Sequence, residues 1–124
     1  MTATGALVLA AGEGRRFGGP KQLALVGGVP VLEHVLRAVR GVPALGPRVL
    51  VLGARADVVR EGVDTAGFAV VVARDWAEGQ SASLRAGVAA LGDVDAALVL
   101  LGDQPFITPP VVAGVLDLAD GADA

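Results

Sequence analysis

Short apolar runs alternate along this chain with amphipathic stretches, and this alternation restricts the fold more than any other feature of the sequence. It is typical of parallel β-strands joined by helical crossovers. Four runs rich in Val, Leu and Ala predict strands that are covered on both faces, over Ala6 to Ala10, Arg48 to Leu52, Phe68 to Val72 and Ala96 to Leu101. The amphipathic stretches predict helices over Pro30 to Val39, Ala56 to Glu61, Ser83 to Leu91 and Pro109 to Ala119. We therefore expect an α/β fold with a mainly parallel sheet.

The first predicted helix illustrates how the sheet is expected to be covered. Its apolar residues recur at helical spacing and predict one side packed on the sheet, namely Val31, Leu32, Val35, Leu36 and Val39. Glu33, Arg37 and Arg40 are expected to face away from the sheet, and Gly41 predicts the end of the helix. His34 lies between the two sides, so we expect a structural role for it.

The crossover rule also predicts where a ligand would bind. Right-handed crossovers place helices on both faces of the sheet, and ligands of such sheets bind beyond the carboxyl ends of the strands. Three unusual segments follow strands at this edge: a glycine-rich loop after the first, residues 74–83 after the third and residues 102–105 after the fourth. We expect all three to open on the same edge and to form one site.

The glycine-rich loop is suited to a polyphosphate. Residues 9–22 read LAAGEGRRFGGPKQ. Gly12 and Gly14 leave the backbone free to adopt positive φ, so that N–H groups can approach a ligand closely. Arg16 and Lys21 supply positive charge where a triphosphate would lie. The alternative interpretation is an ordinary turn whose cations are solvated.

Two better-known phosphate loops are excluded by their spacing. A dinucleotide loop needs G-x-G-x-x-G, but here the glycine after Gly12 and Gly14 comes one position late. No Asp or Glu stands at residues 52–55, where a ribose-binding acid would follow the second strand. A Walker loop needs G-K-[ST], whereas Pro20 precedes Lys21 and a glutamine follows it. The sequence therefore favours neither hydride transfer nor a P-loop NTPase.

The other two segments carry the remaining candidate residues. Asp103 follows the fourth strand and is the best candidate for holding Mg²⁺, since one carboxylate and phosphate oxygens can share that ion. The alternative is an aspartate that starts the turn continued by Pro105.

In the segment after the third strand, Ser81 or Ser83 could cap the following helix, contact the nucleotide, or do both, because a helix N-terminus offers unpaired N–H groups. Trp76 either stacks on an acceptor or covers the strand edge.

Composition narrows the class of protein. The chain has 124 residues, enough for one domain with its own core, and 53% of them are hydrophobic with only 3% aromatic. The net charge of −3 argues against a nucleic-acid partner. The absence of cysteine excludes disulfides and thiolate metal sites, and no apolar run is long enough to cross a membrane. The first nine residues do not look like a signal peptide, so we expect a cytoplasmic protein.

Three motifs give the chain a family resemblance. They are L-A-A-G-x-G-x-R-F-G…P-K at residues 9–21, W-x-x-G-x-x-x-S-L-x-x-G at 76–87 and G-D-Q-P at 102–105. With these motifs the chain resembles the MobA-like nucleotidyltransferases, and within them most of all the molybdenum cofactor cytidylyltransferases. The resemblance implies a three-layer Rossmann-like sandwich in which the four strands present have the order 3-2-1-4.

The resemblance also implies roles for individual residues. Leu9, Ala10, Ala11 and Gly12 would line the nucleotide. Gly14, Ser81 and Ser83 are further nucleotide contacts, which we expect from the chemistry of the loop and of the helix N-terminus and not from the resemblance. The catalytic residues would be Arg16 and Lys21, on the phosphates, and Asp103, as the Mg²⁺ ligand. This list is the set of site residues that we predict.

The implied reaction moves CMP from CTP to a molybdopterin-type cofactor and releases pyrophosphate. CTP is favoured over GTP, and a molybdoenzyme or its maturation factor is the expected protein partner. Alternatives are a guanylyltransferase or sugar-phosphate nucleotidyltransferase of the same fold, or a non-catalytic nucleotide-binding module. The family pattern continues with further strands, a second metal-binding carboxylate and much of the acceptor pocket, so we expect this chain to be a truncated or short form.

Overall fold

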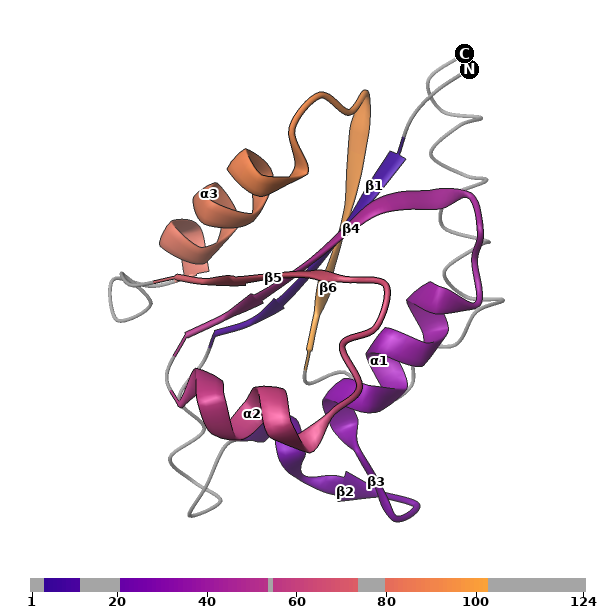
Figure 1. Ribbon diagram of the computed structural model, residues 1–124, viewed down its shortest axis with the longest axis vertical. Coiled ribbons are helices and arrows are strands. Elements are labelled where there is room, and N and C mark those ends of the chain that lie inside the picture. Colours follow the sequence, from indigo (N-terminus) through magenta and orange to yellow (C-terminus); the bar gives the residue numbers. More distant parts are fainter. Residues whose placement is uncertain (1–3, 12–20, 54, 74–79, 103–124) are drawn as a thin grey trace.

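A computed structural model describes residues 4–11, 21–53, 55–73 and 80–102 of the chain (Figure 1). The helices are α1 (Val31–Arg40), α2 (Ala56–Gly62), α3 (Gln80–Leu91) and a 3₁₀ turn, η2 (Lys21–Leu23). The strands are β1 (Thr4–Ala10), β2 (Leu25–Val26), β3 (Val29–Pro30), β4 (Leu45–Leu52), β5 (Ala69–Val72) and β6 (Ala96–Leu101). The predicted helix over Pro109 to Ala119 lies outside the described residues.

The central sheet has four parallel strands in the order β5-β4-β1-β6. In the numbering of the four predicted strands this order is 3-2-1-4, so the predicted topology is confirmed. β1 lies in the middle and all seven of its residues are buried. Leu9 is aligned with Val51 of β4 on one side and with Leu101 of β6 on the other, so these three strands end at nearly the same level.

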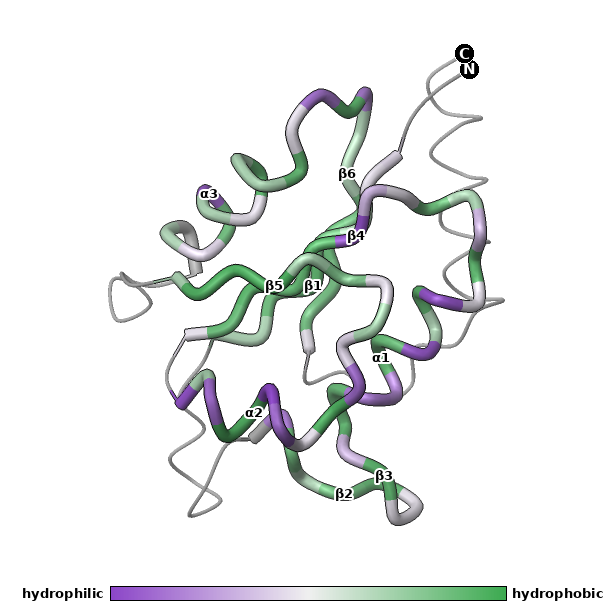
Figure 2. The backbone as a smooth tube through the Cα atoms, viewed as in Figure 1, coloured by the Kyte–Doolittle hydropathy of each residue, from purple (hydrophilic) through white to green (hydrophobic). Residues whose placement is uncertain are grey.

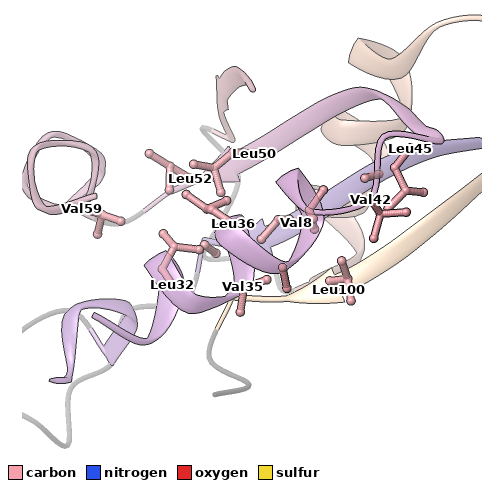
Figure 3. Close-up of a cluster of buried hydrophobic side chains, with 14 residues drawn as sticks. Val8, Leu32, Val35, Leu36, Val42, Leu45, Leu50, Leu52, Val59 and Leu100 are labelled. Atoms are coloured by element: carbon pink, nitrogen blue, oxygen red, sulfur yellow. The ribbon is translucent and has the colours of Figure 1, made fainter. Parts of the chain in front are cut away.

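Helices cover both faces of the sheet, which confirms the predicted three layers (Figure 1). Alternate residues of β1 point to opposite layers, as the strand period of two requires. Val8 packs with α1 and with Val59 of α2 in one apolar cluster (Figure 3), and Leu7 packs with Leu91 of α3 in another. Figure 2 shows that hydrophobic residues concentrate in the strands, while many hydrophilic residues lie on α1, α2 and the turns.

Helix α1 has the predicted buried side but differs from the prediction on its outer side. Its five predicted apolar positions are buried, and the helix ends at Arg40, next to Gly41. Glu33, expected to face away from the sheet, is only 6% exposed. The segment that leads from α2 to β5 folds over this part of α1, and the N–H of Asp64 donates a hydrogen bond of 2.7 Å to Glu33 Oε1. This burial of Glu33 was not predicted from the sequence.

Arg40 completes this polar cluster. Its Nη2 lies 2.7 Å from Glu33 Oε2, and its Nη1 donates to the carbonyl oxygens of Asp64 (2.9 Å) and Ala66 (3.3 Å). The guanidinium also lies 5.9 Å from the centre of the Phe68 ring. A buried carboxylate is tolerated when such partners surround it. The cluster therefore ties the end of α1 to the connection before β5.

A β-hairpin precedes α1 and was not predicted. β2 and β3 pair antiparallel through Gly27 and Gly28, whose φ values are +61° and +80°. Two glycines between apolar residues are the usual signal for such a two-residue turn, and the sequence reads Val-Gly-Gly-Val here. His34 Nε2 lies 2.8 Å from the carbonyl oxygen of Val26, so His34 does have the predicted structural role, linking α1 to the hairpin.

Helix α3 packs unusually close to the sheet at Gly87, the last glycine of the motif at residues 76–87. A Cβ atom at Gly87 would overlap the side chain of Leu7 and would stand 2.9 Å from Val51 Cγ2. Real Cβ atoms do not approach other atoms so closely, so for any larger residue either α3 or the buried side chains of Leu7 and Val51 must shift. Close packing of helix on sheet accounts for this glycine.

We expect Gly87→Ala to lower the free energy of unfolding by about 2 kcal/mol, measured by urea denaturation, because overpacking a core this closely costs about 3 kcal/mol. This cost exceeds the gain of about 1 kcal/mol that alanine brings over glycine within a helix. The control is Val88→Ala, since Val88 is 51% exposed on the same helix and its truncation should change the stability by roughly 0.5 kcal/mol or less. A Gly87→Ala protein as stable as the parent would contradict this account of α3 packing.

Candidate functional site

The carboxyl end of β1 is the centre of the candidate site. Leu9, Ala10 and Ala11, which we predicted to line the nucleotide, are all buried. Their side chains are small or lie in the core, so they can meet a ligand chiefly through backbone atoms. The glycine-rich loop continues directly from Ala11, and its residues 12–20, including the predicted site residues Gly12, Gly14 and Arg16, lie outside the described part of the structure.

The residues that follow the glycine-rich loop are bonded to the carboxyl end of β1. Lys21 is the first residue of η2, and the structure describes its backbone. The next residue, Gln22, is only 4% exposed, and its Nε2 donates a hydrogen bond of 2.8 Å to the carbonyl oxygen of Ala10. The two ends of the loop are therefore joined at its base. Sequence reasoning missed Gln22; the available signal was a polar residue between the predicted cation and an apolar residue, Leu23.

Strand β6 ends beside β1 and brings its last residues to the same place. The N–H of Gly102 donates a hydrogen bond of 2.8 Å to the carbonyl oxygen of Leu9. A Cβ atom at Gly102 would lie 2.9 Å from Ala10 Cβ and 3.0 Å from Leu32 Cδ1. The glycine of the G-D-Q-P motif is thus required by the close approach of the two strands. Asp103, the predicted Mg²⁺ ligand, follows it and lies outside the described residues.

Ala73, the residue that follows β5, is bonded to the end of the neighbouring strand β4. The N–H of Ala73 donates a hydrogen bond of 2.7 Å to the carbonyl oxygen of Leu52, at the end of β4. Helix α3 begins at Gln80, three residues before the predicted start. Ser81 and Ser83 therefore lie inside the first turns and not at the N-cap position, so the capping alternative does not hold for either, and the nucleotide contact stays a prediction. Ser83 is only 3% exposed; for Ser81 the structure gives the backbone alone.

The described residues thus bring together the ends of β1 and β6 and the start of η2. Four polar groups of this edge are engaged in two hydrogen bonds: the carbonyl oxygen of Leu9 accepts from the N–H of Gly102, and that of Ala10 accepts from Gln22 Nε2. Within the same part of the chain, no three His, Cys, Asp or Glu residues come together as a metal-binding group. The roles of Arg16, Lys21 and Asp103 toward phosphate and metal stay predictions.

Comparison with protein families covers nearly the whole chain. Residues 6–124 match the family described as the MobA-like NTP transferase domain. The bifunctional enzyme IspD/IspF of Rhizorhabdus wittichii is 35% identical over 95% of this chain and 31% of its own length. Nicotine blue oxidoreductase of Paenarthrobacter nicotinovorans is 37% identical over 89% of this chain and 54% of its own length. The chain thus spans about a third to a half of these two relatives.

Solved structures show the same fold. Rv0371c of Mycobacterium tuberculosis is 34% identical, with a TM-score of 0.83 over 95% of this chain and 60% of that protein. The same protein, solved in complex with manganese, gives a TM-score of 0.80 at 30% identity, again over 95% of this chain and 60% of that one. A nucleotidyl transferase from Methanothermobacter is 32% identical, with a TM-score of 0.77 over 93% of this chain and 57% of that one.

We expect Gly102→Val to lower the free energy of unfolding by about 1–3 kcal/mol, because the added carbon atoms would force the ends of β1 and β6 apart. The matched control is Ala97→Val in β6, where the residue is exposed. Thermal or urea unfolding of the two variants measures the difference. If both variants unfold like the parent, the close approach at Gly102 is not required.

Proposed function

We propose a nucleotidyl transfer reaction for this chain, which belongs to the MobA-like NTP transferase domain family. In the proposed reaction a phosphate oxygen of the acceptor attacks the α-phosphorus of a nucleoside triphosphate. The bond from the α-phosphorus to the bridging oxygen breaks, and pyrophosphate leaves with that electron pair. In its specific form the proposal is the transfer of CMP from CTP to a molybdopterin-type molybdenum cofactor.

One observation carries the proposal. The backbone on both sides of the glycine-rich loop and the backbone that leads into Asp103 meet at one strand end, through the bonds from Gln22 to Ala10 and from Gly102 to Leu9. A single triphosphate at this end could therefore be reached both from the loop and from Asp103. This is also the edge at which sheets of this type bind their ligands.

The proposed reaction requires mainly that the protein positions the two substrates and neutralises the charge of the phosphates. An acceptor phosphate is already ionised near neutral pH, so this step needs no general base. Arg16 and Lys21 would neutralise charge that develops on the phosphates, while backbone N–H groups at Gly12 and Gly14 would hold their oxygens. Ser83 and the start of α3 would support the nucleotide from the other side of the edge.

A divalent metal is part of the proposal, and the residues at this edge fit it. Gly102, which precedes Asp103 in the chain, lies against Leu9 and Ala10, which precede the glycine-rich loop. In the proposal Asp103 would supply one hard carboxylate, which suits Mg²⁺ when phosphate oxygens and water complete its shell. Bound Mg²⁺ would supply charge neutralisation on the triphosphate. The manganese complex of the similar Rv0371c supports a divalent metal in this family.

The base and the acceptor are the least constrained parts of the proposal. The motifs at residues 76–87 and 102–105 favour CTP and a molybdopterin-type acceptor, with a molybdoenzyme or its maturation factor as a partner. GTP or a sugar phosphate would suit the same phosphate loop, and a module that binds a nucleotide without transferring it is the non-catalytic alternative.

No helix in the described residues has the length and apolar character to span a membrane. A cytoplasmic location stays a prediction.

The deciding experiment supplies CTP or GTP with Mg²⁺ and a molybdopterin-type acceptor and measures pyrophosphate. We expect release with CTP that depends on the acceptor. Pyrophosphate release with GTP but not with CTP would change the proposed reaction from cytidylyl to guanylyl transfer. Release that depends on a sugar phosphate would change the proposed acceptor from a molybdopterin to a sugar phosphate. Nucleotide binding without release from any combination would support the non-catalytic module and contradict the transfer reaction.

We expect Lys21→Ala to lower the rate of transfer by roughly 100-fold or more, because removing one preorganised charge from a transferring phosphoryl group costs that much. The measurement is pyrophosphate release at saturating nucleotide. The matched control is Arg60→Ala, which removes an exposed cation from α2 and should leave the rate unchanged. A Lys21→Ala protein with the parental rate would remove Lys21 from the proposed site.

We expect Asp103→Asn to raise the Mg²⁺ concentration needed for half-maximal transfer by roughly tenfold or more, because a neutral amide is a weaker ligand for a hard cation. Titration of the rate with Mg²⁺ measures this change. Asp93→Asn is the control, since Asp93 is exposed and precedes β6, at the opposite end of the strand from Asp103. An unchanged Mg²⁺ dependence in Asp103→Asn would place the metal elsewhere.

A further inference from the structure

The amide of Gln22 is the one buried side chain that joins the two ends of the glycine-rich loop among the described residues. Only 4% of Gln22 is exposed, and its Nε2 donates to the carbonyl oxygen of Ala10 at 2.8 Å, across twelve positions of the sequence. Ala10 is the last residue of β1. A buried carbonyl that loses its donor is costly, so this hydrogen bond is held firmly.

The turn that contains Gln22 has two further attachments. Leu23 packs against α2 so closely that a Cβ atom at Gly62 would stand 3.1 Å from Leu23 Cδ1. The carbonyl oxygen of Ala24 accepts a hydrogen bond of 2.8 Å from the N–H of Val31, the first residue of α1. These two contacts hold η2 to the helices. Of these three attachments, only the bond from Gln22 reaches the strand end where we propose that the triphosphate binds.

We infer that Gln22 is a positioning residue for the proposed transfer, so this inference rests on the proposed function. Lys21 is joined to Gln22 by one peptide bond and is the first residue of η2. By bonding to Ala10, Gln22 sets the distance at which the backbone of Lys21 stands from the end of β1, and thus from Gly102 beside it. Gln22 itself touches neither phosphate nor acceptor in this proposal.

Loss of the bond should affect the reaction more than the fold. The contacts of Leu23 and Ala24 stay in place without it, so η2 keeps its attachment to α1 and α2. The backbone of Lys21 would be free to shift relative to β1. Displacement of a catalytic group by about 1 Å can cost roughly 100-fold in rate. The loss should fall on kcat, because the charge of Lys21 remains in the neighbourhood of the nucleotide.

The test uses Gln22→Met, which keeps the length of the side chain and removes the donor, and Gln22→Glu, which replaces the amide by a carboxylate. We expect each variant to lower kcat by about 10–100-fold, with the KM for CTP changed by less than about threefold. Hydrogen exchange at the backbone of residues 21 and 22, measured without nucleotide, should become faster. Leu23→Met is the control, a volume-conserving change in the same turn that keeps the Gln22 amide and should keep both readouts.

Two outcomes would overturn the inference. One is parental kcat in Gln22→Met. The other is a loss of kcat no larger than the loss of folded protein, followed by thermal unfolding in the same buffer, which would make Gln22 merely structural. If the parent protein releases no pyrophosphate with any nucleotide, the proposed function fails instead. In that case the hydrogen-exchange measurement still tests whether the hydrogen bond from Gln22 to Ala10 anchors η2 to β1. Faster exchange in Gln22→Met supports this anchoring, and unchanged exchange refutes it.

Discussion

The parallel pairing of β1 with both of its neighbours is the interaction on which the rest of the structure depends. β1 is buried along its whole length, and it is aligned with β4 and β6 so that Leu9 lies level with Val51 and Leu101. This alignment places the end of β6 beside the end of β1, where the N–H of Gly102 reaches the carbonyl oxygen of Leu9. Without it the segments that carry the candidate residues would not share an edge.

Close approach of backbones is the second constraint, and glycine makes it possible at two motif positions. Gly87 lets α3 rest directly on Leu7, and Gly102 lets β6 lie against Ala10. Both glycines belong to motifs that also carry candidate site residues. In family motifs of this kind, some positions are therefore candidates for ligand binding, and others are glycines that allow the close packing of the segments that carry those candidates.

Most of the fold could be predicted because it follows from local patterns. Apolar runs predicted the four central strands, and the spacing of Val31 and Leu32 with their repeats predicted the buried side of α1. The hairpin at Gly27 and Gly28 was missed although its turn signal is present. The burial of Glu33 was missed for a different reason: it depends on a connection thirty residues further along the chain, which no helical periodicity can reveal.

The sequence by itself determined the fold class and the order of the elements, because strand and helix periodicities and the handedness of crossovers are local or general rules. It also predicted the edge of the sheet at which a ligand would bind. Only the tertiary structure decided that Gln22 joins η2 to β1 and that Glu33 is enclosed by Arg40 and Asp64. These contacts link residues far apart in the chain, and a buried polar group takes whichever partner the packed fold brings within reach.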